Sequence, residues 1–267
     1  MNKPNNKLKT FCPLPWNHIS ASPKGAGRVC CEGFKILKDD QGQTALWKNS
    51  SSLHSYLNTK DYKKIRQQML KGERPDHCVH CFNQEDHGVH SIRLQYIEQH
   101  QQDIKKMINN TNEDGSIDNP QITYIDMALG NKCNLKCRMC SPWNSYIIGK
   151  EWEKMGKTYN EAGARKILED KWYASPNTLQ MIKEALPHIQ AIFTTGGEPM
   201  LIKEHLKILE MIIEEGHAHH VLLRYNSNQT VIPEAILKLW KHFQKVAFNC
   251  SIEASGALND YIRYPSK

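Results

Sequence analysis

The sequence predicts an α/β protein in which a small cysteine-rich region precedes a series of alternating strands and helices. Eight of the nine cysteines fall into two groups, one on each side of a polar segment at residues 110–119. After that segment, β-leaning apolar runs alternate with patterns of helical periodicity. Strands separated by helices of this size indicate a parallel sheet or an (α/β) barrel. We therefore expect residues 1–110 and residues 120–267 to form two domains.

The N-terminal region contains few periodic segments. Residues 11–34 are rich in Pro, Gly and Cys, which predicts turns and short strands. Residues 61–71 place their apolar side chains on one stripe and predict a helix that ends at Gly72. Residues 91–109 are polar and also predict helical structure.

The C-terminal region has the regular alternation of an α/β fold. Its predicted strands cover residues 122–128, 189–194, 221–226 and 246–252. Its predicted helices cover residues 143–174, 178–186, 203–215 and 233–245. In parallel α/β folds, ligands bind beyond the carboxyl ends of the strands. The chain places its chemically distinctive residues at those ends: a three-cysteine loop, Gly196-Gly197-Glu198-Pro199, Asn226-Ser227-Asn228 and Glu253.

The three-cysteine loop is the strongest functional signal. Cys133, Cys137 and Cys140 have the spacing CxxxCxxC in a strand-to-helix connection. Thiolates are soft ligands for iron–sulfur clusters, zinc or copper(I). A structural zinc site would usually have a fourth protein ligand, whereas a four-iron cluster held by three cysteines keeps one iron open to a substrate. A structural zinc knuckle is the alternative interpretation.

This loop resembles the hallmark of the radical S-adenosylmethionine (radical SAM) enzymes. The resemblance implies a partial (β/α) barrel and a [4Fe–4S] cluster on Cys133, Cys137 and Cys140. It also implies that S-adenosylmethionine chelates the fourth iron and is split by one electron to a 5′-deoxyadenosyl radical. An electron donor such as flavodoxin or ferredoxin would supply that electron. The cofactor carries the difficult chemistry, and the protein orients it and excludes water.

Later segments resemble the cofactor-binding motifs of the same family. The Gly-Gly-Glu sequence resembles the motif whose glutamate accepts hydrogen bonds from the methionine ammonium. The residue before the third cysteine is usually aromatic and contacts adenine, and a thioether occupies that place in this chain. The residues that the resemblance assigns to the cofactor are Met139, Gly196, Gly197, Glu198, Asn226, Ser227, Ser251 and Glu253.

The first cysteine group predicts a second metal site. Cys78-x-x-Cys81 and a distant cysteine pair form a typical metal-binding pattern. The region resembles the SPASM and twitch domains, which bind auxiliary [4Fe–4S] clusters, in the subgroup whose twitch domain precedes the barrel. We expect the ligands to be Cys12, Cys30, Cys78 and Cys81, with Cys31 as the alternative to Cys30 and zinc as the alternative metal.

The whole pattern predicts a radical SAM enzyme that abstracts hydrogen from a peptide, protein or carbohydrate-like substrate. The alternatives are a truncated, non-catalytic iron–sulfur or zinc-binding protein and a two-cluster electron carrier. The chain ends soon after its fifth predicted strand, so we expect either truncation or a partner chain that completes the barrel. A missing signal peptide and missing apolar span favour the cytoplasm. The net charge of +7 is spread along the chain and favours a mixed-charge surface.

Overall fold

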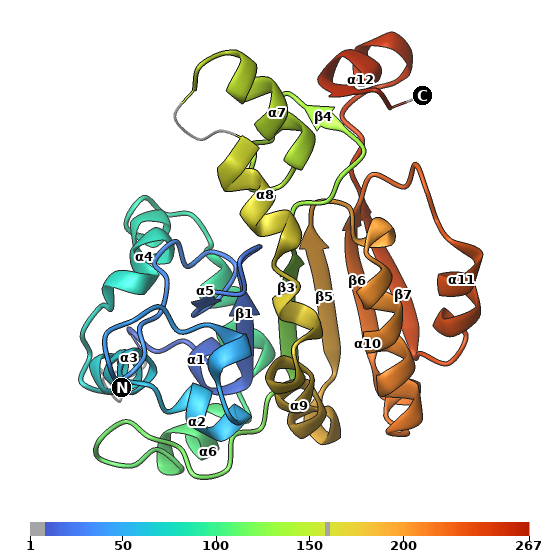
Figure 1. The fold of residues 1–267 in the computed structure, drawn as a ribbon. Coiled ribbons are helices and arrows are strands. Elements are labelled where there is room, and N and C mark those ends of the chain that lie inside the picture. The colour runs from blue at the N-terminus through green and yellow to red at the C-terminus, as the bar shows by residue number, and fades with distance from the viewer. Residues whose placement is uncertain (1–8, 158–160, 267) are drawn as a thin grey trace.

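The computed structural model describes residues 9–157 and 161–266 and shows a mixed α/β chain (Figure 1). Its main sheet has the strand order β2-β1-β3-β5-β6-β7. All neighbouring strands run parallel except β1 and β2, which are antiparallel. The strands are β1 (His18–Ala21), β2 (Gly27–Arg28), β3 (Tyr124–Leu129), β5 (Ala191–Gly196), β6 (Leu222–Ser227) and β7 (Lys245–Cys250). The four strands predicted after residue 120 are thus confirmed to within three residues at each end.

The N-terminal region contributes directly to this sheet. Strand β1 pairs in parallel with β3, with Ile19 opposite Ile125. Both residues are fully buried and belong to one continuous hydrophobic core that includes side chains from both halves of the chain. The sequence predicts short strands in this region but not their place beside the first strand of the α/β region, because the pairing joins residues about a hundred positions apart.

The helices agree with the predicted periodicity and are shorter than it suggests. The predicted helix at residues 61–71 is confirmed as α3, and the long segment at 143–174 divides into α7, α8 and a 3₁₀ turn. The helices of the N-terminal half are α1 (Leu14–Asn17), α2 (Leu53–Leu57), α3 (Lys60–Leu70), α4 (Val79–Asp86), α5 (Ile92–Gln99) and α6 (Ile104–Asn109). Those of the C-terminal half are α7 (Tyr146–Lys154), α8 (Glu161–Glu169), α9 (Pro176–Ala185), α10 (Lys203–Glu214), α11 (Glu234–Trp240) and α12 (Gly256–Ile262).

The two faces of the sheet have different environments. Helices α9 and α10 lie over the face that is turned toward the viewer in Figure 1. Tyr225 of β6 marks this covered face, because its hydroxyl lies 2.9 Å from His205 Nε2 of α10 and accepts a hydrogen bond from Trp240 of α11. Since side chains alternate along a strand, Arg224 and its neighbours in register lie on the opposite face.

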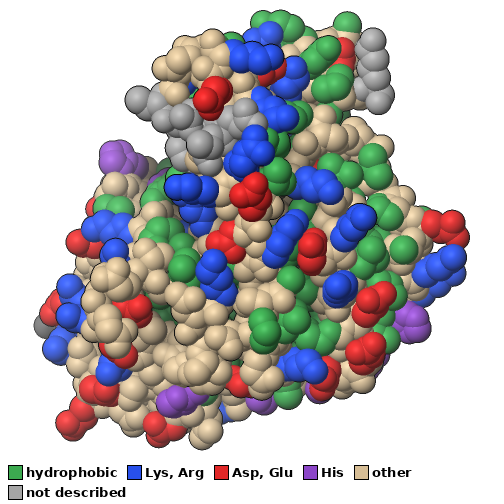
Figure 2. Space-filling view, in the orientation of Figure 1, with side chains coloured by type: hydrophobic (Ala, Val, Ile, Leu, Met, Phe, Trp, Pro, Cys, Tyr) green, Lys and Arg blue, Asp and Glu red, His purple; other side chains and the backbone are tan. Residues whose placement is uncertain are grey.

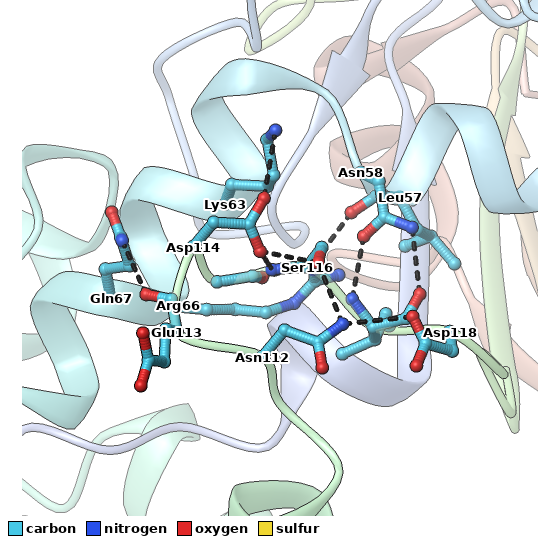
Figure 3. A network of polar contacts seen from close by, with 12 residues as sticks. Leu57, Asn58, Lys63, Arg66, Gln67, Asn112, Glu113, Asp114, Ser116 and Asp118 are labelled. Atoms are coloured by element: carbon cyan, nitrogen blue, oxygen red, sulfur yellow. Dashed lines mark hydrogen bonds and ion pairs between the residues drawn. The ribbon is translucent and has the colours of Figure 1, made fainter.

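A buried arginine connects three segments of the N-terminal region (Figure 3). Arg66 of α3 is fully buried and donates hydrogen bonds to the carbonyl oxygens of Pro15, Leu57 and Gly115 at 2.8–3.2 Å. Burial lowers the pKa of Arg66 to about 10, which leaves the guanidinium charged at neutral pH. These contacts fix the ends of α1 and α2 against the segment that precedes β3.

The polar segment at residues 110–119 packs as a hairpin against α3. Thr111 and Ile117 form an antiparallel bridge, and Asp114 accepts hydrogen bonds from the backbone and the hydroxyl of Ser116. Gly115 has a φ of +82°, and a Cβ at that position would lie 2.3 Å from the carbonyl oxygen of Lys63. Only glycine therefore permits the hairpin to approach α3 this closely.

The surface over the helical face is mixed in charge. Figure 2 shows basic and acidic side chains interspersed over α9 and α10, together with scattered apolar ones. This agrees with the expectation drawn from the dispersed lysines. Among the described residues, no helix is both long enough and apolar enough to span a bilayer.

We predict that Arg66→Met destabilises the fold strongly, because it leaves three buried carbonyl groups without donors. The expected loss is about 3 kcal/mol of unfolding free energy, since each unsatisfied group costs roughly 1–3 kcal/mol. Urea unfolding monitored by circular dichroism would measure it. Lys63→Gln is the matched control on the same helix, because it removes only the exposed contact with Asp114. Equal midpoints for the two variants would contradict the role given to Arg66.

Candidate functional site

The three-cysteine loop follows the carboxyl end of β3 and leads into α7. Cys137 is buried, whereas Cys133 and Cys140 are partly exposed. The backbone N–H of Leu135 donates to Cys133 Sγ, and the N–H of Cys140 donates to the carbonyl oxygen of Cys137. Ser145 holds the far side of the loop by donating its hydroxyl to the carbonyl of Leu135 at 2.9 Å. The loop is therefore an ordered turn whose three thiols come from one short stretch.

The C-terminal segment packs against this loop. Strand β8 (Arg263–Tyr264) pairs with β4 (Lys136–Cys137) in a second, two-stranded antiparallel sheet. Arg263 Nη1 lies 3.8 Å from Cys137 Sγ, and its other nitrogen pairs with Glu253. A hydrogen bond from the thiol of Cys140, together with the charge of Arg263, lowers the pKa of Cys137 to about 6. The lowered pKa favours the thiolate form of Cys137, and the thiolate is the form that binds metal.

The glycine pair after β5 lets the cysteine loop approach the neighbouring strand. Gly196 has a φ of +122°, and a Cβ there would lie 2.7 Å from the backbone nitrogen of Leu129. A Cβ on Gly197 would lie 2.2 Å from the carbonyl oxygen of Lys132. The N–H groups of Gly197 and Glu198 donate instead to the carbonyls of Gly130 and Lys132, at 3.0 and 2.8 Å. In this structure, the close backbone approach that these glycines permit is made to the cysteine loop.

Glu198 connects the ends of two strands. Its side chain is 1% exposed, and burial raises its pKa. The carboxylate accepts hydrogen bonds from the Ser227 hydroxyl and the Asn228 N–H, both at 2.8 Å, and from the N–H of Met200 at 3.2 Å. Asn228 in turn reaches the cysteine loop, where its amide nitrogen lies 4.0 Å from Cys133 Sγ. The second and third predicted motifs therefore meet beside the first.

The remaining predicted cofactor residues lie around this centre. Asn226 accepts a hydrogen bond from Asn249 across β6 and β7, and the N–H of Ser251 donates to Ser227. Glu253 is exposed and paired with Arg263, so its carboxylate lies on the side of the loop that carries Cys137. Met139 is 56% exposed beside the cysteines, where its thioether is accessible to a ligand.

The N-terminal thiols form a second buried group. Cys12, Cys30, Cys78 and Cys81 line one small cavity. Burial raises the pKa of each of these thiols. Arg93 lies at the same cavity, and its positive charge acts to lower the pKa of three of them. Cys31 does not line the cavity and interacts electrostatically with Asp126 of β3.

Neither thiol group is arranged for a single ion. Over residues 9–157 and 161–266, no three or more Cys, His, Asp or Glu side chains converge on a position that could hold one metal ion. A tetrahedral zinc with bonds of about 2.3 Å draws its thiolates to within roughly 4 Å of each other. In a four-iron cluster, each thiolate binds a different iron, so the ligands stand farther apart. The thiol donors of both groups are of the soft type that suits an iron–sulfur cluster or zinc.

Comparison with known families identifies the C-terminal region. The profile of the Radical SAM superfamily matches residues 127–264, which is more than half of the chain. The chain belongs to the radical SAM superfamily. Radical SAM proteins are in general enzymes that use a [4Fe–4S] cluster and S-adenosylmethionine, so the corresponding expectations are supported at this general level. No curated protein matches the chain closely enough to count as a relative.

The candidate site also contains residues that the sequence interpretation did not select. Arg263 contacts the Cys137 thiol from 126 positions away, and no periodicity or motif marks it. Asn228 belongs to the Asn-Ser-Asn segment and contacts both Glu198 and Cys133. The sequence alone does not show which residue of that segment makes these contacts. Single polar residues of this kind are recognised as part of the site only in the folded structure, where the strand ends lie together.

We predict that Gly197→Ala displaces the cysteine loop, because the new methyl group would overlap the backbone of Lys132. Overpacking of this kind costs about 1–3 kcal/mol, and the displaced loop should retain less iron after reconstitution. Urea unfolding and iron analysis would measure the two effects. Gly88→Ala is the control, since a Cβ there meets nothing within 4 Å and causes only backbone strain. Iron retention equal to that of the control would refute the packing argument.

Proposed function

We propose that this radical SAM protein uses Cys133, Cys137 and Cys140 to hold a catalytic [4Fe–4S] cluster and cleaves S-adenosylmethionine reductively. The observation that carries the proposal is the convergence of the CxxxCxxC loop, Glu198 and Asn228 at the carboxyl ends of neighbouring strands. When bound, the cluster would supply one electron to the sulfonium, whose C5′–S bond would break to give methionine and a 5′-deoxyadenosyl radical. The protein holds the thiolates, orients the cofactor and limits access of water.

The chain's own residues have distinct parts in this proposal. Glu198 retains acceptor capacity for the methionine ammonium while its protein contacts fix its position. Gly196 and Gly197 set the separation of the loop and the β5 end. Met139 covers the adenine, and the β6 and β7 ends supply the remaining contacts through Asn226, Ser227, Ser251 and Glu253. The 5′-deoxyadenosyl radical would then abstract a hydrogen atom from a peptide, protein or carbohydrate-like substrate.

We further propose that the N-terminal thiols hold an auxiliary [4Fe–4S] cluster, as in a twitch or SPASM domain. The support is the shared cavity of Cys12, Cys30, Cys78 and Cys81. The same observation favours Cys30 over Cys31 as the second ligand. Arg93 would offset part of the negative charge of the bound thiolates. Zinc stays the competing metal, and an external donor such as flavodoxin or ferredoxin would reduce the catalytic cluster.

We predict that the anaerobically reconstituted chain releases 5′-deoxyadenosine from S-adenosylmethionine when dithionite is added. The Cys133/Cys137/Cys140→Ala triple variant should release none, because no cluster remains to deliver the electron. Glu198→Gln should weaken cofactor binding by roughly tenfold, the effect of losing one charge-assisted hydrogen bond of about 1.4 kcal/mol. Liquid chromatography of the product and equilibrium dialysis of the cofactor would measure these effects.

Two controls make this test specific. Cys250→Ala removes an exposed thiol outside both groups and should leave product formation unchanged. Glu204→Gln removes a partly buried carboxylate of α10 on the covered side and should leave cofactor affinity unchanged. Iron-loaded protein that cleaves no cofactor would refute catalysis, and zinc in the three-cysteine loop would refute the cluster assignment.

We predict a separable metal content for the two thiol groups. The wild-type chain should bind about eight irons, and Cys78→Ala/Cys81→Ala about four, because only the auxiliary cluster is lost. Cys31→Ser should keep all of them, whereas Cys30→Ser should lose the auxiliary set. Iron and sulfide analysis with Mössbauer spectra would count them. Loss of iron in Cys31→Ser but not in Cys30→Ser would reverse the ligand assignment.

A further inference from the structure

The sheet face opposite α10 and α11 carries a row of chemically distinct side chains, and we name it the open face. The pairing register aligns Asp126 of β3, Phe193 of β5 and Arg224 of β6 in one row across the sheet. Exposure increases along the row: Asp126 is 1% exposed, Phe193 is half-buried and Arg224 is exposed. Adjacent strands lie about 4.8 Å apart, so the backbones of Asp126 and Arg224 are roughly 10 Å apart. Phe193 lies on the strand between them.

Asp126 has one hydrogen-bond donor and one nearby cation within the protein. Its Oδ2 accepts a hydrogen bond from Ser20 at 3.0 Å. Burial raises the pKa of Asp126 to about 6, and the nearby charge of Arg28 acts in the opposite direction. Arg28 faces Ser20 in register, which places it in the same row on the far side of Asp126. Arg28 therefore offsets part of the negative charge that Asp126 carries when ionised.

Arg224 has no such counterion. Among the described residues, its side chain makes no hydrogen bond, ion pair or ring contact, although it projects from the middle of a central strand. A guanidinium presents five N–H donors and stays charged at all physiological pH values. Its guanidinium is therefore available to an anionic group that approaches this face.

Two tyrosine hydroxyls lie within electrostatic reach of Arg224. Tyr96 of α5 and Tyr124 of β3 contact each other with ring centroids 6.3 Å apart, which places part of α5 against this face. Burial raises the pKa of Tyr96 to about 12, and Arg224 is one of the charges that acts to lower it. Burial also raises the pKa of Tyr124, against the same influence of Arg224. Neither hydroxyl has a hydrogen-bond partner in the described chain, and both remain neutral donors.

We propose that Arg224, Tyr96 and Tyr124 form an oxyanion-binding site above the ring of Phe193, and that this site anchors a carboxylate or phosphate group of the substrate. The guanidinium and the two hydroxyls lie on one face of the sheet and within electrostatic reach of one another, and a guanidinium binds either anion in a bidentate manner. The half-buried phenyl ring supports the apolar carbon skeleton beside the anionic group. The site thus selects an anionic organic molecule rather than a neutral one.

The position of Arg224 on β6 relates the anion site to the proposed reaction. The assignment of the bound anion as part of the substrate rests on that proposed function. Asn226 lies two residues beyond Arg224 on the same face of β6 and therefore about 7 Å nearer the carboxyl end. Asn226 is among the residues proposed to contact S-adenosylmethionine. A substrate anchored at Arg224 would therefore extend its carbon skeleton toward the cofactor, with its charged group held away from the radical centre.

The test measures anion binding to the full-length chain without added cofactor, using benzoate, phenyl phosphate and benzamide. Ligand-observed NMR titration should show saturable binding of benzoate or phenyl phosphate, with benzamide at least roughly tenfold weaker because it lacks the charge. Whichever anion binds more tightly identifies the substrate group as carboxylate or phosphate. Arg224→Gln should reduce anion affinity by about tenfold or more, and Arg224→Lys should restore part of it. Binding should also weaken with added salt.

Controls separate this inference from a general charge effect and from the proposed function. Lys207→Gln removes one exposed positive charge from α10 on the covered face and should leave anion affinity unchanged. Anions that bind no better than benzamide, or equally to Arg224→Gln and wild type, would overturn the site. Absence of 5′-deoxyadenosine from the wild-type chain, with anion binding that still depends on Arg224, would instead refute the proposed reaction and leave an anion site.

Discussion

The close backbone contact between the β5 end and the cysteine loop is the constraint on which the site depends. Gly197 and Glu198 donate to carbonyls of residues 130 and 132, and a side chain on Gly197 would occupy the space of the Lys132 carbonyl. This contact determines where the loop leaves β3 and therefore where its thiols lie. It also places the Glu198 carboxylate between the ends of β5 and β6, where Ser227 and Asn228 complete its hydrogen bonds.

The charge distribution around the loop follows from the same arrangement. Arg263 arrives from the C-terminal strand β8, lies beside Cys137 and is balanced by Glu253. A thiolate that ligates metal carries negative charge, and a neighbouring guanidinium offsets part of it. On the opposite half of the molecule, Arg93 has an equivalent place beside the buried N-terminal thiols. Each thiol group thus has one arginine that stabilises its charged form.

The sheet relates the two thiol groups to the open face. Strand β1 comes from the cysteine-rich half and pairs with β3, whose carboxyl end leads into the three-cysteine loop. Arg28 and Cys31 lie within electrostatic reach of Asp126 because of this pairing. The N-terminal region therefore forms one wall of the open face as well as holding its own thiols. A substrate on this face would lie between residues from both halves of the chain.

The sequence by itself determined the local chemistry of this protein. Thiol spacing, strand and helix periodicity and the Gly-Gly-Glu motif depend on neighbouring residues, so the three-cysteine loop, the four later strands and the family were predictable. Tertiary structure alone decided which distant residues meet. The pairing of β1 with β3, the contact of Arg263 with Cys137, and the alignment of Asp126, Phe193 and Arg224 all depend on register between segments far apart in the chain. No local pattern encodes such register, because it is set by the packing of the whole sheet.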